Sequence, residues 1–246
     1  MAVAGKKSAD PIFLSVVIPA YNEETKIGRD LESLFDYLDR QPYGAEALVV
    51  DDGSTDRTAQ IARGFAGPGR KVFVLSLGGN RGKGRAVKTG ILAARGRYIL
   101  VVDAGGCVPY NNLERGLGLL EGGGCDAALG SRAVAGSVIR VKQPFLRRVG
   151  ARVFYGILLV GMGIRGIADT QCGFKLFERG AALAVFGLNR IDGFMFDVET
   201  ILNARKLGLK LAEFPVEWTN DPDSRLRLVG GTLRNFKDLF RIRFGI

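Results

Sequence analysis

Histidine is absent from the 246-residue sequence. It is the commonest general base in enzymes and the commonest ligand of transition metals, because its ordinary pKa lies close to neutrality. Its absence excludes histidine-based acid–base catalysis and histidine-ligated metal sites. Any chemistry must use carboxylates, lysine, arginine, hydroxyl groups or the substrate itself.

Cysteine is scarce and scattered. The three cysteines, Cys107, Cys125 and Cys172, stand singly without a CxxC spacing. They therefore form neither a recognisable zinc-ligand set nor a disulfide framework. This usage is typical of a reducing compartment, and we expect a cytosolic setting.

Long apolar runs are missing as well. The longest, residues 153–164, contains three glycines and is well short of the roughly 20 residues that cross a bilayer. The N-terminal segment MAVAGKKSADP has two lysines and no apolar stretch after them, so we expect no secretory signal. The sequence predicts a protein that at most touches a membrane surface.

Positive charge is in excess. Lysine and arginine number 35 against 25 for aspartate and glutamate, a net charge of +10. Such a charge favours nucleic acid, anionic membranes or phosphorylated small molecules as partners. The basic residues fall in predicted loops and beside apolar helical segments, without an aromatic stacking platform or a reading helix. We therefore expect no nucleic acid partner.

Short β-branched runs alternate with helical patterns in the first half. Residues 15–20, 46–52, 71–77 and 97–104 are apolar runs, each followed by a turn and a stretch with helical spacing. The first such stretch places five apolar side chains on one face: Ile27, Leu31, Leu34, Phe35 and Leu38. This alternation predicts βαβ units and a mostly parallel sheet, with ligands at the carboxyl ends of the strands.

The second half is less regular. Residues 125–132 predict another strand, and residues 145–166 predict one or two helices interrupted by glycines. No repeat or low-complexity linker separates the halves. We expect an N-terminal tail, residues 1–13, followed by a single domain, residues 14–246.

Three loops at predicted strand ends carry candidate binding residues. Asp51 and Asp52 fit either nucleotide recognition or a strand-to-helix connection with capping acids. Lys83 and Arg85, near a helix N-terminus, fit either contact with a diphosphate or a solvated basic turn. Asp103, at the end of the run YILVVD, fits a metal or phosphate site. Each pattern by itself leaves its alternatives open.

Taken together, the loops resemble a known family. The segments VVIPAYNEE, VVDDGSTDRT, NRGKGRAVKTG and VVDAGG, in this order, resemble the inverting family 2 glycosyltransferases of the GT-A fold. GSR at 130–132, DTQCGFKLF at 169–177 and VEWTNDPDSRLRL at 216–228 extend the resemblance to the branch that acts on polyprenyl (dolichyl) phosphates. DTQCGFKLF favours the glucosyl over the mannosyl transferases. The resemblance covers about residues 14–243.

This resemblance implies an α/β protein of the GT-A fold. Residues 14–132 would form the nucleotide-sugar-binding half, and residues 133–246 the acceptor-binding, membrane-facing half. The implied activity is transfer of a hexose, glucose from UDP-glucose, to a polyprenyl phosphate with inversion. The implied location is peripheral, at the cytoplasmic face of the membrane.

The resemblance also implies roles for individual residues. Asp103 matches the first carboxylate of the family's DxD motif and would hold Mg²⁺ or Mn²⁺ against the donor diphosphate. Arg132 would contact phosphate, and Asp103, Arg132 and Asp169 would form the catalytic set. The nucleotide-sugar site would comprise Pro19, Tyr21, Glu23, Asp51, Asp52, Lys83, Asp103 and Ala104. The acceptor site would comprise Arg132, Arg147, Gln171, Arg225 and Arg227.

Gly105 departs from the motif, because it replaces the second carboxylate. Mg²⁺ often takes only one or two protein carboxylates together with substrate phosphates and water, so one carboxylate is compatible with an active, metal-dependent site. Two alternatives stay open. One is an active site without metal that relies on Lys83, Arg85 and Arg132. The other is a catalytically silent protein that binds a nucleotide sugar or a lipid phosphate.

The lack of histidine agrees with a phosphate acceptor. The second pKa of a phosphate monoester is about 6, so the attacking oxygen is already anionic at neutral pH and needs no general base. In-line attack would expel a nucleoside diphosphate with inversion, and catalysis would rest on positioning and electrostatics. A sugar hydroxyl acceptor would need a base, for which Asp169 is a candidate. A turn acid before a strand explains Asp169 equally well.

The C-terminal stretch, residues 232–246, is a basic amphipathic pattern. It combines apolar and cationic side chains at helical spacing: Leu233, Phe236, Leu239, Phe240 and Phe244 with Arg234, Lys237, Arg241 and Arg243. Such a helix either lies in the headgroup region of an anionic bilayer or packs on the core of its own domain. A lipid acceptor favours the membrane surface as a partner.

Overall fold

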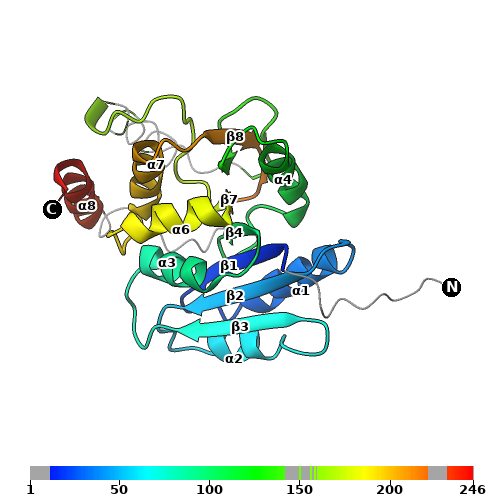
Figure 1. The fold of residues 1–246 in the computed structure, drawn as a ribbon. Coiled ribbons are helices and arrows are strands. Elements are labelled where there is room, and N and C mark those ends of the chain that lie inside the picture. The colour runs from blue at the N-terminus through cyan, green and yellow to red at the C-terminus, as the bar shows by residue number, and fades with distance from the viewer. Residues whose placement is uncertain are drawn as a thin grey trace.

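A mostly parallel sheet of seven strands forms the centre of the protein (Figure 1). The computed structural model describes residues 12–141, 150, 156, 158, 160–220 and 232–245. The strands lie in the order β3-β2-β1-β4-β7-β5-β8. Only β7 is antiparallel to its neighbours, β4 and β5, which confirms the predicted α/β class. Their bounds are β1 Leu14–Ala20, β2 Ala45–Asp51, β3 Lys71–Ser76, β4 Tyr98–Val102, β5 Ala127–Ser131, β7 Phe174–Glu178 and β8 Leu211–Pro215.

Helices cover both faces of the sheet. One face packs against α1 (Ile27–Leu38), α2 (Thr58–Arg63) and α4 (Leu113–Glu121), and the other against α3 (Lys83–Ala93), α6 (Arg179–Leu188) and α7 (Phe196–Lys206). Successive strand side chains point to opposite faces, so Val16 joins the first core and Val17 the second. The apolar face predicted for α1 is buried, as expected: Ile27, Leu31, Leu34, Phe35 and Leu38.

The strand order brings the candidate loops together. β1 lies between β2 and β4. In sequence β2 and β3 come before β4, and they lie on the opposite side of β1 from β4. The loops that follow β1 and β4 are therefore neighbours at the carboxyl edge, where open α/β sheets bind ligands. Because β7 runs antiparallel to β4, the loop that precedes β7 enters at this same edge.

The remaining elements are short or lie at the periphery. The strand predicted at residues 125–132 is β5, and residues 179–206, for which the sequence patterns predicted nothing, form α6 and α7. A small parallel ribbon joins β6 (Val138–Ile139) to β9 (Glu217–Trp218), and a 3-10 turn spans Tyr110–Asn112. The helices predicted at residues 145–166 lie mostly outside the described residues. Within the described part, no helix combines the length and the apolar character needed to cross a membrane.

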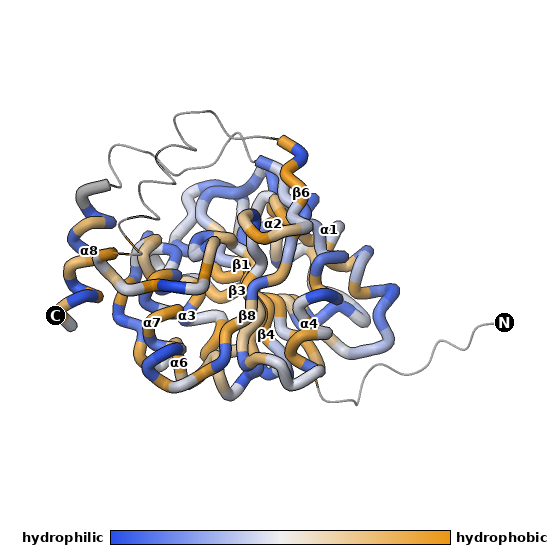
Figure 2. Tube along the Cα trace, turned by 90° about the horizontal axis from the view of Figure 1, so that it is seen from above, coloured by the Kyte–Doolittle hydropathy of each residue, from blue (hydrophilic) through white to orange (hydrophobic). Residues whose placement is uncertain are grey.

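The C-terminal amphipathic segment forms α8 (Thr232–Phe244) at the edge of the molecule, on the α3, α6 and α7 side of the sheet (Figures 1 and 2). Its Leu239 belongs to the same core as the side chains of α6 and α7. Figure 2 shows hydrophobic and hydrophilic residues alternating along this helix.

Candidate active site

Asp103 follows the last residue of β4 and lies against the loop that precedes β7. Its backbone N–H donates to the Gly173 carbonyl over 3.0 Å. A Cβ atom on Gly173 would stand 2.1 Å from Oδ2 of Asp103, well inside van der Waals contact. The glycine of the DTQCGFKLF segment is therefore required by the close approach of the Asp103 carboxylate.

Lys83, the first residue of α3, makes an ion pair with Asp103. Its Nζ lies 2.6 Å from Oδ1 of Asp103, and its side chain is 21% exposed. Burial by itself lowers the pKa of Lys83, but the carboxylates of Asp103 and Asp197 outweigh that effect and the pKa is raised. Lys83 is therefore an ammonium cation held in contact with the strand-end carboxylate.

A second, more deeply buried ion pair lies near Lys83. Lys175 of β7 donates to Oδ1 of Asp197, in the first turn of α7, over 2.7 Å. Both side chains are almost completely buried, and Lys175 also donates to the Cys172 carbonyl over 2.6 Å. Burial raises the pKa of Asp197, and Lys175 and Lys83 only partly offset this rise. Carboxylate and ammonium groups thus alternate from Asp103 to Lys175.

The start of α3 is held by the loop between α6 and α7. Gly84 and Arg85 donate their backbone N–H groups to the Asp192 carbonyl over 2.8 and 3.3 Å. A Cβ atom on Gly84 would lie 2.4 Å from the Ile191 carbonyl oxygen. Arg85 Nε also pairs with the Asp192 carboxylate at 3.0 Å. The polar groups at this helix start therefore have partners within the chain: the Asp192 carbonyl accepts the backbone N–H groups, and the Asp192 carboxylate pairs with Arg85. Contact of Arg85 with a diphosphate stays a prediction.

The two aspartates at the end of β2 organise their own loops. Asp52 accepts the backbone N–H groups of Arg81 and Gly82 over 2.7 and 2.9 Å. Asp51 accepts the N–H of Ser54 over 3.0 Å. Both aspartates are buried, and burial raises the pKa of Asp52 despite these hydrogen bonds. The structure supports the interpretation as a connection with structural acids, while a contact with nucleotide stays a prediction.

The loop after β1 is clasped to the loop after β2. Asn22 adopts a positive φ of 52°, which asparagine tolerates better than most residues. It accepts the Thr55 N–H on Oδ1 over 2.7 Å and donates its own N–H to Ser54 Oγ over 2.8 Å. Glu23 donates its N–H to Thr58 Oγ1 over 2.7 Å. The segment that carries Tyr21 and Glu23, after the buried Pro19, therefore has a fixed backbone.

Gly105 has a backbone conformation that explains the missing carboxylate. Its φ is +110°, a value that L-residues rarely adopt. Its N–H donates to the Asp30 carboxylate of α1, so the turn after the half-buried Ala104 is pinned to a neighbouring helix. An aspartate at position 105 would strain this turn.

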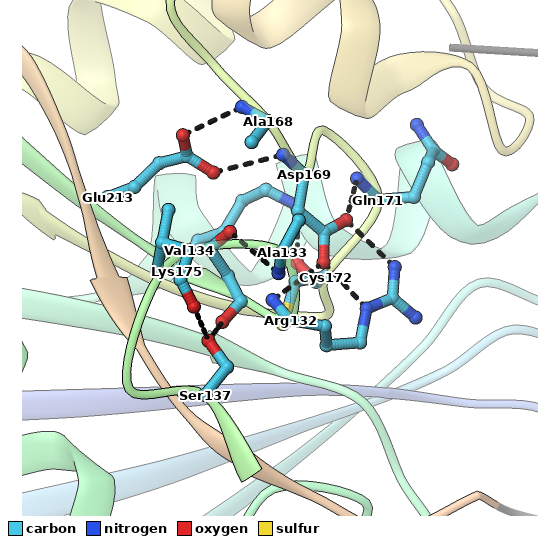
Figure 3. A network of polar contacts seen from close by, with 11 residues as sticks. Arg132, Ala133, Val134, Ser137, Ala168, Asp169, Gln171, Cys172, Lys175 and Glu213 are labelled. Atoms are coloured by element: carbon cyan, nitrogen blue, oxygen red, sulfur yellow. Dashed lines mark hydrogen bonds and ion pairs between the residues drawn. The ribbon is translucent and has the colours of Figure 1, made fainter. Parts of the chain in front are cut away.

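Arg132 and Asp169 form a bidentate ion pair between the end of β5 and the loop before β7 (Figure 3). Arg132 Nε and Nη2 donate to the two carboxylate oxygens over 2.6 and 2.8 Å, and the Arg132 backbone N–H adds a third bond of 3.0 Å. Burial raises the pKa of Asp169, but Arg132 outweighs burial and the pKa is lowered. An anion so well satisfied is poorly suited to take a proton from a hydroxyl group.

The Arg132–Asp169 pair has its own supports. Glu213 of β8 accepts the backbone N–H groups of Ala168 and Asp169 over 2.7 and 2.9 Å (Figure 3). The Arg132 guanidinium also lies over the Trp218 ring, 5.4 Å from its centroid. Burial raises the pKa of the Cys172 thiol to about 12, so it is not a nucleophile at neutral pH.

Gln171 leaves one polar atom in the buried part of this loop without a partner. Its backbone N–H donates to Asp169 over 3.2 Å. Its side-chain Nε2 is buried and has no hydrogen-bond partner among the described residues. A buried donor of this kind suits a ligand oxygen. The predicted acceptor residues Arg147, Arg225 and Arg227 lie outside the described residues.

One loop, residues 169–173, connects the three predicted catalytic residues, Asp103, Arg132 and Asp169. Asp169 lies at its start, beside Arg132, and Gly173 lies at its end, beside Asp103. Sequence reasoning missed Asn22, Asp192, Asp197 and Lys175. Lys175 had a visible signal, because a lysine stands alone inside the otherwise apolar strand FKLF.

The residues present fit a divalent cation that takes one protein carboxylate. Among the described residues, no three acidic or cysteine side chains gather in a metal-binding cluster. Asp103 nevertheless accepts a positive charge at short range, with the Lys83 ammonium standing in for a cation. Mg²⁺ and Mn²⁺ complete such a site with diphosphate oxygens and water.

Comparison with known proteins identifies the family. Residues 15–186 match glycosyl transferase family 2. The chain is 36% identical to the dolichyl-phosphate beta-glucosyltransferase of Dictyostelium discoideum, covering 98% of this chain and 77% of the relative. It is also 36% identical to the human enzyme of that name, covering 94% and 74%. The Saccharomyces cerevisiae enzyme of that name is 34% identical, with 95% and 75% covered.

Solved structures agree on the fold. Glucosyl-3-phosphoglycerate synthase from Mycobacterium tuberculosis, in complex with Mn²⁺, UDP-glucose and phosphoglyceric acid, superposes with a TM-score of 0.70 at 20% identity, covering 96% of this chain and 80% of that one. This likeness concerns the fold alone, and it is the GT-A fold that the sequence motifs predicted. Because its loops, its sheet and its relatives agree, this chain belongs to glycosyltransferase family 2 and is a glycosyltransferase.

Proposed function

We propose that the protein transfers glucose from UDP-glucose to a polyprenyl phosphate of the dolichyl type, with inversion at the anomeric carbon. The observation that carries the proposal is the similarity to dolichyl-phosphate beta-glucosyltransferases, which spans 94–98% of this chain and 74–77% of those relatives. The geometry supports it, because Lys83 and Arg132 place cationic groups near Asp103, which suits two phosphate-bearing substrates.

The donor would bind at the carboxyl edge of β1, β2 and β4. The clasped loops after β1 and β2 would hold the base and ribose, with Pro19, Tyr21 and Glu23 on one side and Asp51 and Asp52 fixing the backbone. Asp103, Ala104 and Lys83 would lie at the diphosphate. A preformed backbone lowers the entropy lost when the donor binds.

The acceptor would bind on the side of Arg132 and Gln171. An oxygen of the lipid phosphate attacks the anomeric carbon and forms the new bond. The bond from that carbon to the donor diphosphate breaks, and its electron pair leaves with UDP. The attacking oxygen is already anionic at neutral pH, so the step needs no base. Asp169 holds Arg132 in place through its bidentate pair.

We propose Mg²⁺ or Mn²⁺ as the cofactor, with Asp103 as its protein ligand. Bound there, it would neutralise charge that develops on the leaving diphosphate. Lys83 and Arg132 would add positive charge near the same group.

The alternative of a catalytically silent binding protein rested on Gly105. The geometry of Gly105 weakens it, because the positive φ and the bond to Asp30 show a turn built for glycine. The named relatives are enzymes, which also favours activity.

We also propose that the protein works at the cytoplasmic membrane face, which α8 contacts with its outward side. Asp238 and Leu239 are buried, and Asn235 and Ile242 are half-buried, on one side of the helix. The opposite side presents Phe236, Phe240 and Phe244, which are 47%, 57% and 61% exposed. Residues four apart lie on one helix face, so these three rings form a continuous exposed row.

The positive charge around this row of rings favours an anionic membrane as its partner. Four exposed cations flank it: Arg234, Lys237, Arg241 and Arg243. A second copy of the chain would bring equal positive charge to the same face, whereas an anionic bilayer complements it. Aromatic rings flanked by lysine and arginine are the arrangement of helices that lie in the headgroup region.

The test of the activity is direct. Purified protein is incubated with radiolabelled UDP-glucose, a polyprenyl phosphate and Mn²⁺ or Mg²⁺, and lipid-extractable label is measured. GDP-mannose replaces UDP-glucose in a parallel reaction. We expect a glucosyl lipid with UDP-glucose and UDP as the second product. No glycolipid from any donor would refute the proposal.

A further inference from the structure

The ammonium group of Lys83 occupies one carboxylate oxygen of Asp103, the residue proposed as the metal ligand. Oδ1 of Asp103 is a buried atom, and Lys83 Nζ lies 2.6 Å from it. A divalent cation bound to the same oxygen would bring two positive charges within a few ångströms of the ammonium. Like charges at that distance repel strongly in a partly buried site. The cation and the ammonium therefore cannot both hold this oxygen.

We propose that Lys83 competes with the divalent cation for Asp103 and is released to the donor diphosphate when the cation binds. The inference rests on the proposed function, because it needs a diphosphate donor at Asp103. It assigns to Lys83 two alternating partners in place of one fixed contact.

The backbone around Lys83 is anchored, so only the side chain has to move. Gly82 donates its N–H to the Asp52 carboxylate over 2.9 Å, and Gly84 donates to the Asp192 carbonyl over 2.8 Å. These bonds fix the residues on either side of Lys83. The lysine ammonium stands on a flexible stem of four carbons. Rotation about the bonds of this stem is enough to shift the ammonium between neighbouring acceptors without disturbing α3.

Other groups can hold the ammonium while it leaves Asp103. Asp197 raises the pKa of Lys83 alongside Asp103, and the Phe196 ring centroid lies 5.9 Å from Nζ. Asp197 is itself fixed by Lys175. We therefore assign Asp197 and Lys175 as positioning residues, which keep Lys83 near the site in both of its states.

The charge balance makes metal binding depend on the donor. Asp103, Lys83, Asp197 and Lys175 are two carboxylates and two ammonium groups, which sum to zero. A divalent cation alone would leave this cluster with two uncompensated positive charges. A diphosphate supplies the missing negative charge and a new partner for Lys83. The cation and the nucleotide should therefore bind cooperatively.

The test compares Mn²⁺ binding with and without UDP in Lys83→Met and in a matched control. Lys88→Met removes the same charge from the same helix, but Lys88 donates to the Asn189 carbonyl over 2.6 Å. Binding of Mn²⁺ alone is measured from the decrease of the paramagnetic resonance signal of the free ion. UDP binding in the presence of Mn²⁺ is followed by calorimetry. Unchanged thermal unfolding verifies the fold of each variant.

We expect Lys83→Met to raise the affinity for Mn²⁺ alone about tenfold, because one nearby charge is removed. The same change should lower the affinity for UDP, whereas Lys88→Met should change neither by much. Adding Asp103→Asn to Lys83→Met should abolish the gain. Equal or weaker Mn²⁺ binding in Lys83→Met, or an equal gain in Lys88→Met, would overturn the inference.

These outcomes are separable from the activity test. If the wild-type protein makes no glycolipid, the proposed function fails whatever the metal measurements show. If it makes glycolipid but Lys83→Met gains no Mn²⁺ affinity, only the competition fails.

Discussion

The Asp103 carboxylate lies where a side chain on Gly173 would have to be. A Cβ atom at position 173 would come within 2.1 Å of Oδ2 and 2.2 Å of Cγ of Asp103. The two residues are 70 positions apart, yet the geometry of one fixes the identity of the other.

Gly173→Ala should displace the Asp103 carboxylate from its place beside Lys83. Overpacking of this kind costs about 1–3 kcal/mol of unfolding free energy, and a misplaced group at the reacting centre lowers the rate by about a hundredfold. Urea unfolding and glucosyl transfer measure the two effects. Gly180→Ala is the control, because nothing lies within 4 Å of its added methyl group. Normal transfer by Gly173→Ala would contradict the placement of Asp103.

Asp169→Asn should destabilise the protein in a pH-dependent way. It leaves the Arg132 guanidinium, whose side chain is only 26% exposed, without its counter-charge, a loss of about 3 kcal/mol. The pKa of Asp169 is lowered from 3.8 by folding, so its stabilisation is complete above that value and disappears as the pH falls through the lower folded value. The difference between wild type and variant should therefore be full at neutral pH and shrink under strongly acidic conditions.

Urea unfolding at a series of pH values measures this difference. Asp39→Asn provides the comparison, because Asp39 pairs with Arg70 at 3.6 Å on the surface. An exposed pair contributes about 1 kcal/mol or less. A loss that is equal in the two variants would show that the Arg132–Asp169 pair is not a buried one.

Gly105→Asp should not improve the enzyme, although it restores the DxD pattern. The positive φ at this position makes an L-residue cost about 1–3 kcal/mol, and the turn that carries Asp103 would shift. We expect a lower melting temperature and reduced transfer. Gly118→Asp on α4 is the control, because that glycine has open space around it. A gain of activity in Gly105→Asp would revive the interpretation of a degenerate site.

Phe240→Ser should weaken binding to anionic vesicles. Burying a phenylalanine side chain contributes about 1.5–3 kcal/mol, so the partition coefficient should fall roughly tenfold to hundredfold. Sedimentation with phosphatidylglycerol-containing vesicles measures this, and added salt should weaken wild-type binding. Leu92→Ser is the control, because Leu92 is 53% exposed on α3. Equal loss in both variants, or self-association without vesicle binding, would contradict the assignment of α8.

The sequence patterns predicted the frame of the site well. Strand ends are local signals, so the place of Asp103 after β4 and the order of the loops followed from apolar runs and turns. The sequence could not show that Asp52 binds the Arg81 and Gly82 backbone, because that contact depends on how two separate loops pack. The same reason hid Asp192 and Asp197, which reach α3 from more than 100 residues away.

For the amphipathic C-terminal segment, the sequence pattern could not show which apolar residues face the domain core and which face outward. Its apolar residues were grouped together, but the helix divides them. Leu239 turns inward to the domain core, while Phe236, Phe240 and Phe244 turn outward. The inward face confirms the interpretation that the helix packs on its own domain, and contact of the outward face with a membrane stays a prediction.

The late position of β7 in the sequence has a consequence for folding while the protein is being made. A ribosome that has released β1 to β4 has already produced Asp103 and Lys83, but not Gly173, Lys175 or Asp197. The half-made chain therefore carries the strand-end carboxylate without the buried charges that surround it. Contacts between segments distant in sequence form slowly, because the long loop between them must first be closed. The nascent domain gains its catalytic edge only when β7 enters the sheet from the opposite direction.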